Sequence, residues 1–198
     1  MHQWGELMDK NEVIRFFDTL ADSWDSMQVR NEEIIELILH KSQIQQGVKV
    51  LDVACGTGVL FGDYLDRGAW VTGIDISGEM LKIAKEKYPQ VSLVCGDAEV
   101  YDFDDKYDVV MIYNAFPHFP NPAGLIENLS KFLKNGGRLT VAHGISMAEL
   151  EKCHSGKART VSLPLPEKEA LAEIMSPYIN VDTLISDERM YMVSGVKK

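Results

Sequence analysis

The fold is decided by residues 50–60, which read VLDVACGTGVL. The apolar start of this stretch is typical of a buried strand, and its two glycines mark a sharp turn that opens a helix. Gly56 and Gly58 allow the backbone to turn tightly and to approach a ligand closely. A strand, a glycine turn and a helix in this order predict a nucleotide-binding α/β fold.

Short apolar runs alternate with helical stretches along the middle of the chain. Strands are predicted at residues 48–53, 70–74, 91–94, 109–112 and 138–142. Crossover helices are predicted between them at residues 60–67, 79–88 and 122–133, the last ending at a basic and glycine-rich stop, residues 134–137. This alternation predicts a doubly wound, mostly parallel sheet with right-handed crossovers and helices on both faces.

The two ends of the chain add helices and a hairpin. Residues 11–40 carry two helical patterns before the first strand, and residues 166–175 carry another. Residues 179–185 and 189–196 read as strands joined by residues 186–188, a connection too short for a crossover. An antiparallel hairpin at the edge of the sheet is therefore predicted. No structure is predicted for residues 144–165.

Charge and hydropathy exclude several classes of partner. The net charge of −10 would repel a phosphate backbone, so nucleic acid is not expected as a partner. The first residues lack the basic start and apolar run of a signal peptide, and no run of about 18 apolar residues occurs. We therefore expect a cytoplasmic protein without membrane insertion. The sequence leaves monomer and homodimer open.

The cysteines and histidines do not predict a metal site. Cys55, Cys95 and Cys153 are widely spaced and form no Cys-x-x-Cys pair, so neither a disulfide framework nor a zinc cage is indicated. His143, Cys153 and His154 match no standard zinc spacing. We expect no metal.

Acidic residues follow the ends of two further predicted strands. Asp75 comes 19 residues after Gly56, where a carboxylate can accept hydrogen bonds from two ribose hydroxyls. Asp97 and Ala98 follow the third strand, where an acidic side chain beside a backbone amide can bind the edge of an adenine. Phe61 stands where dinucleotide-binding enzymes have a third glycine, so a pyrophosphate site is disfavoured.

Together these features resemble the class I S-adenosylmethionine (SAM)-dependent methyltransferases. The first motif of that family reads acidic-x-Gly-x-Gly-x-Gly, and residues 52–58 match it except that Ala54 replaces the first glycine. The resemblance covers residues 48–142, and residues 135–139 are similar to the family's turn into the fifth strand. It implies SAM as cofactor, S-adenosylhomocysteine as product, and a cofactor site made of Asp52, Ala54, Cys55, Gly56, Gly58, Asp75, Ile76, Met80, Asp97, Ala98 and Asn114.

The resemblance also implies roles and an architecture. Asp52 would hold the ammonium end of the cofactor, and Ile76 would pack on its adenine. Residues 16–25 are similar to the entry helix of quinone-type C-methyltransferases, with Trp24 where tyrosine is usual. We expect a seven-stranded Rossmann-like sheet in one domain, residues 1–198. Its parts would be cap helices at 1–46, the SAM-binding core at 47–143, and the acceptor-side loop, helix and strands at 144–198.

Residues at the carboxyl edge of the sheet are candidates for the acceptor site. Methyl transfer from a sulfonium is an in-line displacement, so positioning in a dry pocket supplies much of the rate and a base is optional. His118 and His143, which follow the fourth and fifth strands, are the candidate bases. Trp24, Phe116, His118 and Phe119 are expected around a small-molecule acceptor. Nothing in the sequence identifies O, N, C or S as the accepting atom.

Three alternative functions stay open. A nicotinamide oxidoreductase agrees with the first turn but conflicts with Phe61 and with the lack of a Tyr-x-x-x-Lys pair. A nucleic-acid methyltransferase shares the cofactor core, yet residues 114–117 read NAFP rather than the Asn-Pro-Pro-Tyr motif of base-amino methylation. A SAM-binding module without catalysis would carry the same cofactor motifs, so turnover is needed to separate it from an enzyme.

Overall fold

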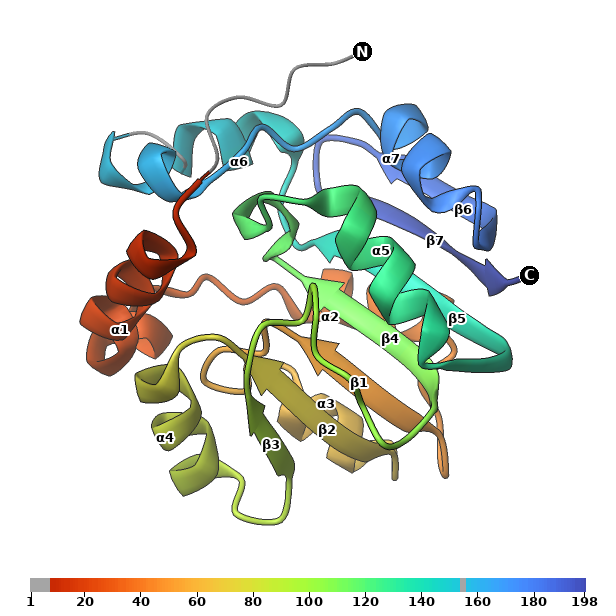
Figure 1. Ribbon diagram of the computed structural model, residues 1–198, viewed down its shortest axis with the longest axis horizontal. Coiled ribbons are helices and arrows are strands. Elements are labelled where there is room, and N and C mark those ends of the chain that lie inside the picture. The colour runs from red at the N-terminus through yellow and green to blue at the C-terminus, as the bar shows by residue number, and fades with distance from the viewer. Residues whose placement is uncertain (1–7, 154–155) are drawn as a thin grey trace.

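The computed structural model describes residues 8–153 and 156–198 (Figure 1). Its sheet has the strand order β3-β2-β1-β4-β5-β7-β6. The parallel strands are β1 (Lys49–Val53), β2 (Trp70–Asp75), β3 (Ser92–Cys95), β4 (Tyr107–Tyr113) and β5 (Leu133–His143). The last strands, β6 (Ile179–Ser186) and β7 (Tyr191–Lys197), form an antiparallel hairpin. The predicted mostly parallel, seven-stranded sheet is confirmed.

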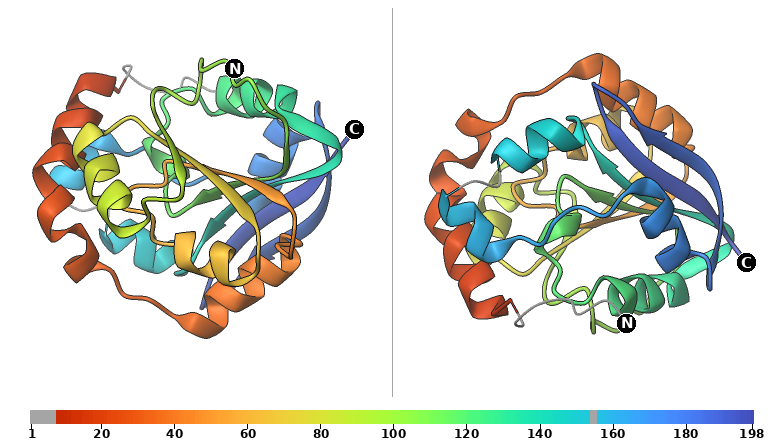
Figure 2. Two further views of the ribbon diagram at one scale, coloured as in Figure 1. Left: turned by 90° about the horizontal axis from the view of Figure 1, so that it is seen from below. Right: turned by 90° about the horizontal axis from the view of Figure 1, so that it is seen from above.

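Helices cover both faces of the sheet, as the sequence predicts. Figure 2 shows α2 (Glu32–Lys41) and α3 (Phe61–Asp66) on one face, and α5 (Pro122–Lys131) and α7 (Lys168–Met175) on the other. The crossover helix α4 (Gly78–Lys87) packs in the same apolar cluster as α2 and α3. Parallel strands between two helical layers are buried on both sides, which explains their nearly continuous apolar sequences.

Several of these helices begin at residues that cap them. The side chain of Asn31 accepts a hydrogen bond from the amide of Ile34 at the start of α2. Ser77 does the same for Met80 at the start of α4. Such caps satisfy backbone amides that have no partner within the helix, and they explain why the chain turns into a helix at these points.

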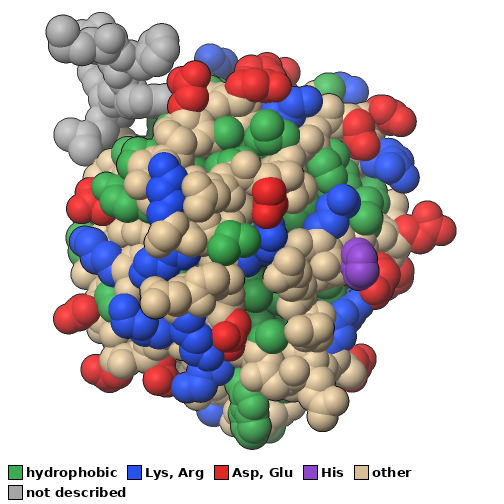
Figure 3. All heavy atoms as spheres, turned by 90° about the vertical axis from the view of Figure 1, so that its right-hand side faces the viewer, with side chains coloured by type: hydrophobic (Ala, Val, Ile, Leu, Met, Phe, Trp, Pro, Cys, Tyr) green, Lys and Arg blue, Asp and Glu red, His purple; other side chains and the backbone are tan. Residues whose placement is uncertain are grey.

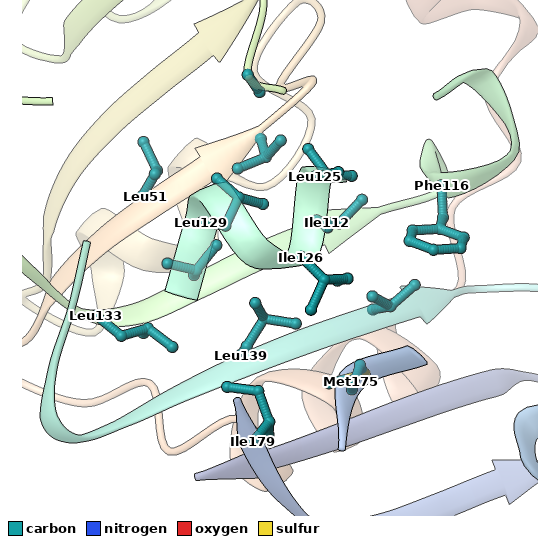
Figure 4. Packing of buried hydrophobic residues seen from close by; sticks show 14 of the residues in the cluster. Leu51, Ile112, Phe116, Leu125, Ile126, Leu129, Leu133, Leu139, Met175 and Ile179 are labelled. Atoms are coloured by element: carbon teal, nitrogen blue, oxygen red, sulfur yellow. The ribbon is translucent and has the colours of Figure 1, made fainter. Parts of the chain in front are cut away.

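The sheet divides the core into two apolar layers. Figure 4 shows the layer beneath α5 and α7, where Leu51, Ile112 and Leu139 from the strands meet Leu125 and Leu129 from α5. The second layer joins the opposite face of the sheet to α2, α3 and α4. Burial of both layers fixes the register of the strands, because a shift by one residue would exchange the faces.

Strand β5 begins earlier than the predicted strand, which covered residues 138–142. Leu133 already pairs with Tyr107, and Arg138 pairs with Val109, so the glycine-rich residues 134–137 form an irregularity inside the strand rather than a separate stop. Glycine suits position 137, because a Cβ there would lie 3.0–3.1 Å from three backbone oxygens and press against them.

The hairpin lies at the edge of the sheet, but its second strand is the inner one. β7 is antiparallel to β5, which leaves β6 as the outermost strand. Buried Arg138 donates to both carboxylate oxygens of Asp182 on β6, at 2.8 and 2.7 Å. Figure 3 shows this side of the molecule, where acidic and basic side chains are interspersed. Asp182 places a charge on the edge strand, which opposes pairing with another chain.

The carboxyl ends of the parallel strands are covered by helical segments. In Figure 1, α1 (Lys10–Met27) lies beyond the arrowheads of β1 and β2. Residues 144–165, for which the sequence predicts no structure, contribute α6 (Met147–Cys153) and the 3-10 segment η2 (Gly156–Val161). Within residues 8–153 and 156–198, no helix combines the length and apolar character needed to cross a membrane.

Candidate active site

A pocket lies at the carboxyl edge of the sheet, between the ends of β1 to β4 and helix α1. The order of the strands reverses at β1 and β4, which is where open α/β sheets form a crevice for ligands. The described residues that line the pocket include every predicted cofactor residue except Gly58. They are Asp52, Ala54, Cys55, Gly56, Asp75, Ile76, Met80, Asp97, Ala98 and Asn114. Residues from four strand ends therefore meet in one cavity.

The glycine turn owes its shape to three residues with positive φ. Gly58 has φ +81°, and a Cβ there would lie 2.6 Å from the ring of Phe61. Gly58 thus allows the turn without lining the pocket. Ala54 and Gly56 have φ +54° and +55°. A left-handed conformation costs an alanine about 1–2 kcal/mol, which gives a physical reason for glycine at the Ala54 position of the related motif.

Asp75 joins the two turns that border the pocket. Its carboxylate accepts a hydrogen bond from the amide of Gly56 and another from the amide of Ser77, both at 2.8 Å. A carboxylate offers about four lone-pair sites, so Asp75 can also accept hydrogen bonds from a ligand's hydroxyl groups. Burial raises the pKa of Asp75 to about 6, although hydrogen bonds from the backbone amides act in the opposite direction.

Asp52 lies buried on β1 beside Asp75 and lines the same pocket. Burial, strengthened by the negative charge of Asp75, raises the pKa of Asp52 to about 8. A buried carboxylate of this kind is stabilised by a cation, so its chemistry fits a ligand with an ammonium group.

The unliganded protein is expected to lose stability as the pH rises between 6 and 7.5. The folded state still holds a proton on Asp52 in this window, whereas the unfolded state has released it, so higher pH favours unfolding. The free energy of unfolding is expected to fall by about 1.4 kcal/mol per pH unit, or about 2 kcal/mol over the window. Urea unfolding of wild type, Asp52→Asn and the exposed control Asp102→Asn measures it. If the free energy of unfolding falls equally steeply with pH in wild type and Asp52→Asn, the expectation is wrong.

Helix α1 is attached to the three loops that form the floor of the pocket. It crosses the ends of β3, β2 and β1 in that order, through hydrogen bonds of Lys10 with Asp97, Asp18 with Ser77, and Asp25 with Thr57. Val13 and Phe17 of the same helix line the pocket. The 3, 4 and 7 spacing of apolar residues predicts the helix but not these polar contacts, because they join residues far apart in sequence.

Aromatic rings form one wall of the pocket. An ideal Cβ on Gly56 would lie 3.7 Å from the indole nitrogen of Trp24, so Trp24 stands over the glycine turn. The ring of Phe17 makes edge contacts with Trp24 and with His118, at centroid distances of 5.5 and 4.9 Å. Phe119 also lines the pocket. Trp24, predicted for the acceptor side, is thus close to the predicted cofactor turn.

His118 belongs to the 3-10 segment η1 (Phe116–His118) and contacts the last residue of η2 and the residue that follows it. Its Nδ1 lies 2.8 Å from the carbonyl oxygen of Val161 and 3.2 Å from the hydroxyl of Ser162. A carbonyl only accepts hydrogen bonds, so this contact places the proton on Nδ1, and Nε2 is then the basic nitrogen of the neutral ring. The amide of Leu163 donates to Pro117 at 2.7 Å and joins the same two segments.

Phe116, predicted for the acceptor pocket, and His143, predicted as a candidate base, are not among the described residues that line the pocket. Phe116 is 1% exposed and belongs to the apolar cluster beneath α5 and α7, where Figure 4 labels its ring. His143 is fully buried at the end of β5, with its ring 6.0 Å from that of Tyr191 on β7. Both side chains are therefore buried, away from the described residues that line the pocket.

The structure describes no metal centre. Among the described residues, no three His, Cys, Asp or Glu side chains are grouped to hold a metal ion. His154 lies outside the described residues, as does the side chain of Cys153.

The sequence is similar to known methyltransferases. Residues 50–137 match the family model described as a methyltransferase domain. The chain is 31% identical over 142 residues to the ubiquinone biosynthesis O-methyltransferase of Coxiella burnetii, covering 67% of this chain and 61% of that protein. It is also 31% identical over 140 residues to the demethylmenaquinone methyltransferase of Paenarthrobacter aurescens, covering 67% and 54%. The chain thus spans about three fifths or less of the length of these relatives.

A solved structure extends the similarity of fold beyond residues 50–137. The magnesium protoporphyrin IX methyltransferase of Synechocystis PCC 6803, solved with bound S-adenosylhomocysteine, superposes with a TM-score of 0.73 and 20% identity. The superposition covers 96% of this chain and 100% of that chain. The helices before β1 and the hairpin after β5 are therefore part of the shared fold.

Proposed function

We propose that this chain, which belongs to the class I SAM-dependent methyltransferases, transfers the methyl group of SAM to a small aromatic acceptor. One observation carries the proposal: Asp52, Asp75 and Asp97, from the ends of three adjacent strands, line one pocket beneath α1. Carboxylates at these places, of which Asp52 and Asp75 are buried, suit the ammonium, the ribose and the adenine amino group of SAM.

Each part of the cofactor has candidate partners in the described lining. Asp52 would hold the ammonium group, and Asp75 would accept hydrogen bonds from the ribose hydroxyls. Ile76 and Met80 supply apolar surface for the adenine, and Asp97 would accept a hydrogen bond from the adenine amino group. When bound, SAM supplies an electrophilic methyl group on a positively charged sulfur.

The character of the pocket favours an uncharged aromatic acceptor. Phe17, Trp24 and Phe119 provide flat apolar surface. Lys10 is the one lysine or arginine among the described lining residues, and it is already paired with Asp97 and Glu99. An acceptor with a carboxylate or phosphate would lack a counter-ion there. The similarity to relatives named for ubiquinone and demethylmenaquinone supports an aromatic ring system.

His118 is the residue placed to take a proton from a hydroxyl acceptor. The contact with Val161 fixes the proton on Nδ1 and orients the ring, so that Nε2 is the proton acceptor in the neutral form. The aromatic wall beside His118 would exclude water from the reacting groups and hold the acceptor in line with the methyl group.

Titration calorimetry and a methyl-transfer screen test this function. We expect saturable binding of SAM and S-adenosylhomocysteine, no binding of NADH, and transfer of the labelled methyl group from SAM to members of a panel of catechols and hydroquinones. Amines, thiols and oligonucleotides complete the panel. Binding of NADH alone or methylation of the oligonucleotides would contradict the proposal. Binding of SAM without transfer to any acceptor would instead indicate a non-catalytic binding module.

A further inference from the structure

We propose that Lys10 is a positioning residue for the cofactor. It holds the Asp97 carboxylate ready for the adenine amino group, and it fastens the first turn of α1 over that end of the pocket. This inference rests on the proposed function, because it requires the adenine to lie at Asp97.

The ammonium group of Lys10 bridges two carboxylates that are far from it in the sequence. Its Nζ lies 2.5 Å from an oxygen of Asp97 and 2.5 Å from an oxygen of Glu99. The other oxygen of Glu99 accepts a hydrogen bond from the amide of Asn121 at 2.8 Å. The other oxygen of Asp97 accepts one from the amide of Glu99 at 3.0 Å. Both carboxylates are thereby oriented around one cation.

The charges make this arrangement dependent on Lys10. The side chain of Glu99 is only 5% exposed, whereas those of Lys10 and Asp97 are 35% and 24% exposed. Without the ammonium group, Glu99 would keep an unpaired buried charge next to a second carboxylate, which is strongly unfavourable. Burial lowers the pKa of Lys10, but the hydrogen bonds to Asp97 and Glu99 outweigh this, so the pKa lies above its ordinary value. Lys10 therefore remains charged.

The position of Lys10 connects this cluster to release of the cofactor. Lys10 is the first residue of α1, and both Lys10 and Asp97 line the pocket. The later contacts of α1, at Asp18 and Asp25, bind the loops after β2 and β1. Loss of the Lys10 contacts should thus open the adenine end of the pocket and leave the other two loops attached.

The test compares Lys10→Met with Arg15→Met by surface plasmon resonance. Arg15 is on the same helix, is exposed and has no ion pair with the described residues, so its substitution removes the same charge without these contacts. For Lys10→Met we expect the Kd of S-adenosylhomocysteine and of adenosine to rise about tenfold, mainly through faster dissociation. Dissociation from wild type should quicken with added salt, and this dependence should be weaker in Lys10→Met. Lys10→Arg should stay close to wild type.

Each outcome decides the inference. Equal effects of Lys10→Met and Arg15→Met, or weaker binding of S-adenosylhomocysteine with unchanged binding of adenosine, would overturn it. If Lys10→Met does not fold by circular dichroism, Glu99→Gln removes half of the cluster and should still quicken dissociation; an unchanged rate there would also overturn it. Failure of wild type to bind S-adenosylhomocysteine at all would instead refute the proposed function.

Discussion

Asp75→Ala is expected to weaken binding of SAM and S-adenosylhomocysteine by at least about 100-fold. A hydrogen bond to a charged group contributes about 1.5–3 kcal/mol, so two ribose contacts are worth at least about 3 kcal/mol, or roughly 100-fold in Kd. The substitution also removes the acceptor that joins the amides of Gly56 and Ser77, which loosens both turns around the ligand. Titration calorimetry gives the Kd values.

Two variants separate these contributions. Asp75→Asn keeps the shape of the side chain and one carbonyl acceptor, so we expect a loss smaller than that of Asp75→Ala. Asp102→Ala removes an exposed carboxylate outside the pocket and should bind as wild type does. A folded Asp75→Ala protein with wild-type affinity would show that the ribose does not lie at this carboxylate.

The convergence of the acidic residues was predictable from the sequence. Parallel strands end at one edge of the sheet, so a carboxylate directly after a predicted strand is placed at that edge once crossovers are right-handed. Asp75 and Asp97 each follow such a strand, and both line the pocket. The alternation of strands and helices was sufficient here because it is a local property of the sequence.

The acceptor side could not be predicted in the same way. η1 is a single short turn without a repeating pattern, so the sequence does not show that Phe119 faces the pocket while Phe116 enters the core. For His143, the alternation of side chains along the strand does indicate a buried position. It shares a face of β5 with Leu139 and Val141, whose side chains belong to the cluster beneath α5 and α7. The contacts of Lys10 with Asp97 needed the structure, because they span 87 residues.

His118→Ala is expected to lower kcat with a hydroxyl acceptor by about 10²–10⁴-fold, the range that a positioned general base contributes. The Kd of SAM should change little, since the proposed contacts of the cofactor are made by Asp52, Asp75 and Asp97. Steady-state kinetics with the best acceptor from the screen gives kcat, and titration calorimetry gives the Kd of SAM.

His118→Asn distinguishes a base from a residue that only shapes the pocket. The asparagine amide can donate to the carbonyl of Val161 much as Nδ1 does, so it preserves the contact between η1 and the end of η2. It has no basic nitrogen, however. If His118 takes the proton, the asparagine variant will be as slow as His118→Ala. If His118→Asn instead has the kcat of wild type and differs only in the KM of the acceptor, the ring of His118 orients the acceptor. Proton removal then needs no basic residue at this position.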